Sequence, residues 1–95
     1  MLVTFHSKDH YPIQMFGEPA LELIRMMGLN PKVPGALYAD DVPQALWQLQ
    51  EALAELEPVL VVGEQERPVS LQQRASPLLE MLRKAVKAQH PVHWD

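Results

Sequence analysis

The stretch VSLQQRASPLLEMLRKAVKAQ, residues 69 to 89, predicts the helix around which the other elements pack. Its apolar positions alternate at spacings of four and three, which is the period of an amphipathic helix lying on a core. These positions are Leu71, Ala75, Leu78, Leu82 and Ala85, with Leu79 and Val86 widening the face. Ser70 and Gln73 have the spacing of a capping box, so we expect the helix to begin there.

Pro77 interrupts this helical pattern. It lacks a backbone N–H donor, and its ring crowds the carbonyl of Gln73 four residues earlier. We therefore expect a short first piece that ends near Ala75, then a bend, and then the main helix from Pro77 onward. Ser76 is the predicted cap of that second piece, with the proline in its first turn.

The composition of the 95-residue chain excludes several classes of function. The length and the hydrophobic content of 47% predict a single soluble domain over residues 1–95. Cysteine is absent, which excludes disulfides, thiolate metal sites and cysteine nucleophiles. The net charge is −4 with scattered cations, which argues against nucleic acid as a partner. No apolar run approaches the ~20 residues of a membrane span, so we expect no membrane partner and a cytoplasmic location.

Two alternating segments near the N-terminus predict a β-hairpin. In residues 2–6, Val3 and Phe5 point to one face and Leu2, Thr4 and His6 to the other, and residues 11–15 resume an extended pattern after a polar turn. Further along, Pro34-Gly35 is typical of a type II turn. The remaining expected elements are a helix over 17–27 ended by Gly28, a short strand over 36–39, a helix over 41–56 capped by Asp40, and a strand over 92–94 beside the first strand.

This order of elements predicts an α+β fold with two layers. Its small, mostly antiparallel sheet consists of the N-terminal hairpin plus the C-terminal strand, and three helices cover one face. Residues 57–68 predict a flexible linker before the bent C-terminal helix, since prolines and charged residues punctuate them. Within that linker Val59 to Val62 is apolar, and the pattern fits either an edge strand or a loop packed over the core.

Several short segments, in their order and spacing, resemble one bacterial family. They are Met1-Leu2-Val3-Thr4-Phe5 with Ser7, Met15-Phe16-Gly17, Pro34-Gly35-Ala36, Asp41-Val42-Pro43 with Ala45-Leu46, Val69-Ser70-Leu71, Gln73-Arg74-Ala75, Pro77-Leu78-Leu79, Val92 and Trp94. The chain resembles domain-of-unknown-function family 1840 over most of its length. The resemblance implies a small cytoplasmic protein of proteobacteria, and it implies no catalytic residue because the family has no assigned activity.

Histidines supply the candidate metal site. If the two terminal strands are neighbours, His6 and His93 lie together on the sheet face away from the core. Asp9, His10 or Asp95 could then complete a set of nitrogen and oxygen ligands for zinc or another divalent transition metal. The alternative interpretation is solvated histidines on a sheet surface, since a site requires three or four convergent ligands.

Trp47 and Arg74 are the other candidate functional residues. Trp47 lies one position off the leucine line of the second predicted helix, so its ring belongs at the edge of the buried face or in an interaction surface. Arg74 lies beside the expected bend at Pro77, where its guanidinium could bind an anion or satisfy free carbonyls. The structural role is favoured, because buried acceptors require partners.

The function that these features favour is non-enzymatic protein contact, either as a homo-oligomer or with a protein partner. No cofactor is expected for that role. The alternative is a metal- or small-ligand-binding protein that uses the histidines of the two chain ends. A third hypothesis, an enzyme with an anion pocket at Arg74, requires a concave site that the sequence does not predict.

Overall fold

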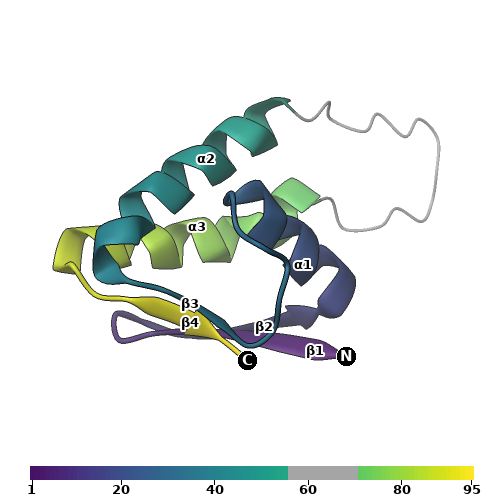
Figure 1. The fold of residues 1–95 in the computed structure, drawn as a ribbon, viewed down its shortest axis with the longest axis horizontal. Helices are drawn as coiled ribbons and strands as arrows, with labels where there is room; N and C mark the ends of the chain where they lie inside the picture. The colour runs from purple at the N-terminus through teal and green to yellow at the C-terminus, as the bar shows by residue number, and fades with distance from the viewer. Residues whose placement is uncertain (56–70) are drawn as a thin grey trace.

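The computed structural model describes residues 1–55 and 71–95. Within them the fold has two layers, a four-stranded antiparallel sheet and three helices that cover one of its faces (Figure 1). The α+β architecture predicted from the sequence is therefore confirmed. The expected linker over 57–68, the apolar segment from Val59 to Val62 and the Ser70 cap lie outside the described residues.

The sheet joins the two ends of the chain. Its strands are β1 (Leu2–Ser7), β2 (His10–Phe16), β3 (Gly35–Leu37) and β4 (Val92–Trp94), in the order β2-β1-β4-β3. Neighbouring strands are antiparallel throughout. Phe5 lies opposite Trp94 in the β1–β4 register, so the C-terminal strand lies beside the first strand as predicted.

Alternating side chains explain why the hairpin forms one wall of the core. Val3 and Phe5 are fully buried, and their partners across the register, Met15 and Ile13, are each 8% exposed. Successive side chains of a strand point to opposite faces, so this spacing turns one face of the sheet toward the helices. The other face receives the residues between them.

Three helices complete the core. They are α1 (Gly17–Met26), α2 (Val42–Glu55) and α3 (Leu71–Ala88). The predicted apolar face of α3 is buried, since Ala75, Leu78, Leu82 and Ala85 are inaccessible to solvent. α1 ends before Gly28, whose φ of +85° is a left-handed conformation that glycine adopts without strain.

α3 is one continuous helix through Pro77, so the two separate pieces predicted from the sequence are wrong. The proline removes a single backbone donor, the one that would bond to the carbonyl of Gln73. Ala75 and Leu78, on either side of it, are fully buried in the core, and this burial outweighs the local loss. Ser76 lies inside the helix and is exposed, so the cap predicted there is also wrong.

The start of α2 also differs from its prediction. A 3-10 turn, η1 (Ala39–Asp41), precedes the helix, and the backbone N–H of Asp41 donates to the carbonyl of Tyr38 at 2.9 Å. This backbone bond closes the turn without a hydrogen bond from a capping side chain. The cap predicted at Asp40 is therefore wrong.

Trp94 anchors the last strand in the core. Its side chain is 3% exposed, its ring centroid lies 5.8 Å from that of Phe5, and its Nε1 donates to the carbonyl of Lys32 at 2.8 Å. Gly35 lies opposite Trp94, and a Cβ at Gly35 would come within 2.5 Å of the indole ring. Close approach of the tryptophan is therefore what requires glycine here. The predicted type II turn is wrong, because Gly35 is a strand residue without a positive φ.

Candidate functional site

The most distinctive surface is the sheet face that no described helix covers, which we call the open face (Figure 1). The strand registers place on it the residues that alternate with the core positions: Leu2, Thr4, His6, Gln14, Phe16, Ala36 and His93, with Asp95 directly after β4. None of the four strands contains aspartate, glutamate, lysine or arginine. An antiparallel sheet with one solvated face ordinarily has polar and charged residues there, so this composition is unusual.

The polar side chains of the open face are paired with one another. His6 and His93 lie opposite each other in the register, with their rings stacked at a centroid distance of 4.7 Å and an angle of 14°. His6 Nε2 donates to Asp95 Oδ1 at 3.1 Å, and Gln14 Nε2 donates to Thr4 Oγ1 at 3.4 Å. These contacts reduce the number of groups on the face that require water as a partner.

Large apolar side chains occupy the other end of the open face. Leu2 and Phe16 are register partners on β1 and β2, and they are 52% and 64% exposed. Met1, 72% exposed, continues this surface and holds the start of α1, since its carbonyl accepts from the Gly17 N–H at 2.9 Å. An open pocket of about 480 Å³ lies beside them, lined by Met1, Phe16, Gly17, Glu18, Pro19 and Leu21.

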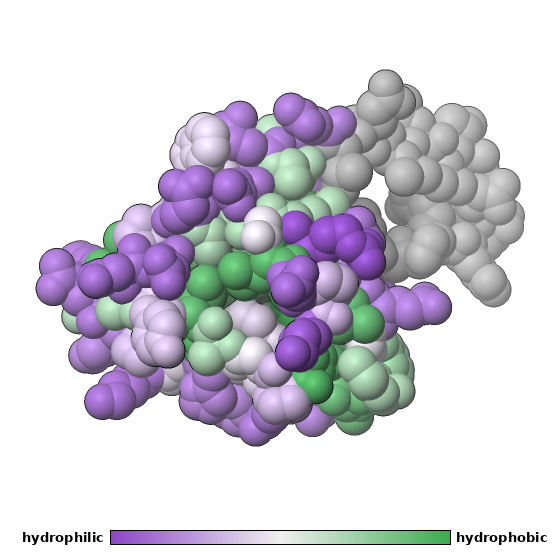
Figure 2. Space-filling view, in the orientation of Figure 1, coloured by the Kyte–Doolittle hydropathy of each residue, from purple (hydrophilic) through white to green (hydrophobic). Residues whose placement is uncertain are grey.

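Hydrophobic residues gather where the N-terminus lies, whereas the surface over α2 is mostly hydrophilic (Figure 2). This apolar end was not predicted from the sequence. The alternation over residues 2–6 predicted that Leu2 is on the outward face, but no role was predicted for Leu2 or Phe16. The signal that could have identified them is the absence of charged residues from both predicted hairpin strands.

The predicted metal ligands are only partly brought together. His6 and His93 are neighbours, but the His10 side chain lies elsewhere and is 4% exposed. Its Nδ1 donates to the Tyr11 carbonyl at 2.8 Å, and its Nε2 lies 4.0 Å from Glu80 of α3. Over residues 1–55 and 71–95, no group of three or more His, Cys, Asp or Glu side chains is placed to hold a metal ion.

Asp9, the other ligand considered, pairs with a different histidine. The Nδ1 of His90 donates to the Asp9 carboxylate, at 3.1 Å from Oδ1 and 3.0 Å from Oδ2. This contact ties the hairpin turn to the segment between α3 and β4, a structural role. The metal site at His6, His10 and His93 therefore remains a prediction.

Trp47 lies on the outer side of α2. Its side chain is 57% exposed, although Ala45 and Leu49 on either side of it are buried. The ring does not complete the core edge, which was the alternative interpretation of its position. An exposed tryptophan is a residue type enriched in protein interfaces.

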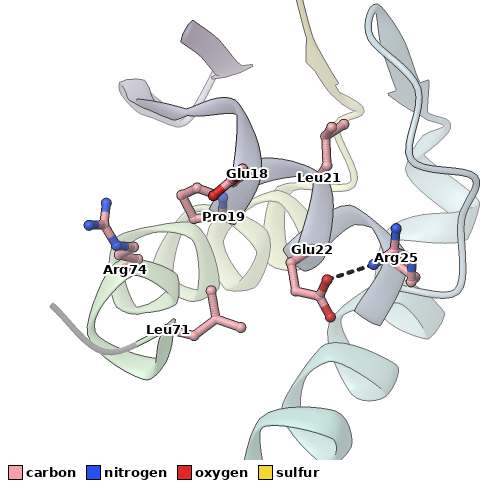
Figure 3. Close-up of a pocket in the computed structure, with 7 residues that line it drawn as sticks. All are labelled: Glu18, Pro19, Leu21, Glu22, Arg25, Leu71 and Arg74. Carbon is pink, nitrogen blue, oxygen red and sulfur yellow. Dashed lines mark hydrogen bonds and ion pairs between the residues drawn. The ribbon is translucent and has the colours of Figure 1, made fainter. Parts of the chain in front are cut away.

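Arg74 lines a pocket of about 550 Å³ between α1 and the first turns of α3 (Figure 3). The ion pair of Glu22 and Arg25, with a 2.6 Å contact, stands on one side of this pocket and Arg74 on the other (Figure 3). Over residues 1–55 and 71–95 the Arg74 guanidinium makes no hydrogen bond or ion pair, so the role of satisfying carbonyls is not observed there. Glu18 also lines the pocket, so the charges of its two acidic side chains, Glu18 and Glu22, balance those of its two arginines.

Comparisons with known proteins identify the chain at the level of a family. Comparison with curated proteins and with solved structures gives no significant match. Among the described helices none is long and apolar enough to cross a bilayer. The family model of a domain of unknown function, DUF1840, matches residues 1–94. The chain therefore belongs to the DUF1840 family.

Proposed function

We propose that the chain is a non-enzymatic module of the bacterial cytoplasm that acts by contact with another protein chain, either a second copy or a protein partner. The open face carries this proposal. Two large apolar side chains, Leu2 and Phe16, are more than half exposed on it, and no strand contributes a charged side chain. Depletion of charge with exposed aromatic residues is the composition that marks the centre of protein interfaces.

Trp47 is a second surface through which the same function could act. It lies on α2, in the layer above the sheet, so contact through Trp47 and contact through the open face involve different sides of the molecule. Tryptophan supplies a large contact area at little entropic cost and is often an interface hot spot. We therefore include Trp47 in the proposal as an independent position to test.

Photo-cross-linking in producing cells tests the proposal. A benzophenone amino acid would replace Phe16 in one variant and Trp47 in another, with Lys87, an exposed residue near the end of α3, as the matched control position. We expect a discrete cross-linked protein product from Phe16 or Trp47 and none from Lys87. Equal products from all three positions, or none from any, would contradict a role in protein contact.

The metal-binding alternative is a separate prediction. Its support is the stacking of His6 on His93 and the hydrogen bond from His6 to Asp95, although no three such side chains of the described residues are placed to hold a metal ion. Metal analysis of protein purified without an affinity tag tests it. Stoichiometric zinc that is lost in a His93→Ala variant would establish the alternative.

A further inference from the structure

We infer that the partner of the open face is a second copy of this chain, packed sheet against sheet in a two-fold symmetric dimer. This inference rests on the proposed function and specifies its partner. In such a dimer the same surface serves on both copies, so the face must be compatible with itself. Three properties of the open face meet that requirement.

The first property is the distribution of charge. The chain has a net charge of −4, so two copies repel one another at long range. Apart from Asp95, the Asp, Glu, Lys and Arg residues of the described segments lie on helices and in connecting segments, outside the four strands. Contact through the open face therefore brings together surfaces that are nearly free of charge. A strongly charged partner would gain nothing from such a surface.

The second property is the internal pairing of polar groups. Asp95, the acidic residue of this face, is held by His6 at 3.1 Å, and Gln14 and Thr4 are bonded to each other. Burying a polar group costs free energy when its hydrogen bonds to water are lost without replacement. Because these bonds are made within one copy, they survive when a second copy excludes the water.

The third property is the position of the apolar side chains. Leu2 and Phe16 lie at the same end of β1 and β2, where the two strands are register partners. A two-fold axis parallel to the strands places this end of one copy over the same end of the other. When this axis passes between β1 and β2, Phe16 of each copy lies over Leu2 of the other, and the two side chains bury each other's surface.

The size of the face predicts the strength of the contact. Two strands of six and seven residues and two of three residues span a projected area of about 300 Å², given strand spacing near 4.8 Å and a rise near 3.4 Å per residue. That is small for a permanent dimer. We therefore expect a reversible dimer with a dissociation constant in the micromolar range.

Charge substitution on the face tests the dimer. Light scattering over a concentration series should show the wild-type mass rise from 10.8 kDa toward twice that value. Phe16→Lys should raise the dissociation constant about 100-fold or more, because each copy would bury an unpaired ammonium. Gln44→Lys is the control, since it adds the same charge at an exposed position of α2, away from the open face, and should leave the constant unchanged.

Single cysteines provide a test that does not depend on a charged variant folding. The chain has no cysteine, so Thr4→Cys at the centre of the open face and Gln44→Cys on exposed α2 each introduce one thiol. A short bismaleimide should link Thr4→Cys copies and leave Gln44→Cys copies unlinked.

Two results would overturn the inference. One is a wild-type mass that stays at one chain up to about 0.5 mM, well above a micromolar dissociation constant. The other is equal linking at the two cysteine positions. If the wild type stays monomeric while the Phe16 photo-cross-linker captures a different protein, the second-copy inference fails and the proposed function stands.

Discussion

Replacing Trp94 by phenylalanine tests how the two ends of the chain are held together. Trp94 is 3% exposed, and its Nε1–H donates to the Lys32 carbonyl at 2.8 Å. The phenylalanine ring retains the contact with Phe5 but has no hydrogen-bond donor. The substitution therefore removes the hydrogen bond and the outer part of the indole and keeps the rest of the packing. Trp47→Phe makes the same chemical change at a position that is 57% exposed.

The structure gives the size of the expected effect. A carbonyl that loses its partner in a half-buried site costs about 1 to 3 kcal/mol. The smaller ring leaves space that corresponds to about 1 kcal/mol of cavity cost. We therefore expect the free energy of unfolding to fall by about 2 to 4 kcal/mol for Trp94→Phe, and by less than about 0.5 kcal/mol for Trp47→Phe.

Urea denaturation followed by far-ultraviolet circular dichroism measures the difference, because the helical backbone dominates this signal in both variants. With a slope of about 1.5 kcal/mol per molar urea, the Trp94→Phe midpoint should fall by about 1.3 to 2.7 M. The Trp47→Phe midpoint should move by less than about 0.4 M. Equal midpoints for the two variants would refute the placement of Trp94 in the core beside Lys32 and Phe5.

Three other predictions follow from the same contacts. Gly35→Ala should lower the free energy of unfolding by about 1 to 3 kcal/mol in the same assay, because the added Cβ would displace the Trp94 ring, and an unchanged midpoint would contradict that packing. Pro77→Ala should raise the free energy of unfolding by about 1 to 2 kcal/mol, because Pro77 is exposed inside a continuous helix. A lower midpoint would contradict the continuity of α3 through this position. Zinc should leave the Tm unchanged because His6 and His93 are stacked and His10 lies elsewhere, whereas a rise abolished by His93→Ala would favour a metal site.

The hairpin, the three helical segments and the C-terminal strand could be predicted because each has a local pattern. Alternation identified Val3 and Phe5 as core residues, and the four-three spacing identified the buried face of α3. The continuity of α3 through Pro77 could not be predicted in this way. It depends on the burial of Ala75 and Leu78 against other elements, and a local rule for proline does not include that free energy.

The need for glycine at position 35 could not be predicted from the sequence either. A proline-glycine pair suggested a turn, whereas the actual cause is the indole of Trp94, which is far away in the chain and adjacent only in the sheet. The open face is a similar case. Alternation assigned Leu2 and His6 to the outward side, but whether a helix or nothing covers that side depends on how the layers assemble.

In β4, a residue that stabilises the fold and a residue of the surface proposed for contact point to opposite faces of the sheet. Trp94 points into the core and the preceding His93 points to the open face, although the two are adjacent in the chain. Substitutions at Trp94 should therefore change the free energy of unfolding of one chain, and substitutions at Phe16 should change association and leave that free energy nearly constant. If Phe16→Lys lowered the stability of the monomer as strongly as Trp94→Phe does, Phe16 would be a core residue of the single chain, and its exposure would no longer indicate a partner.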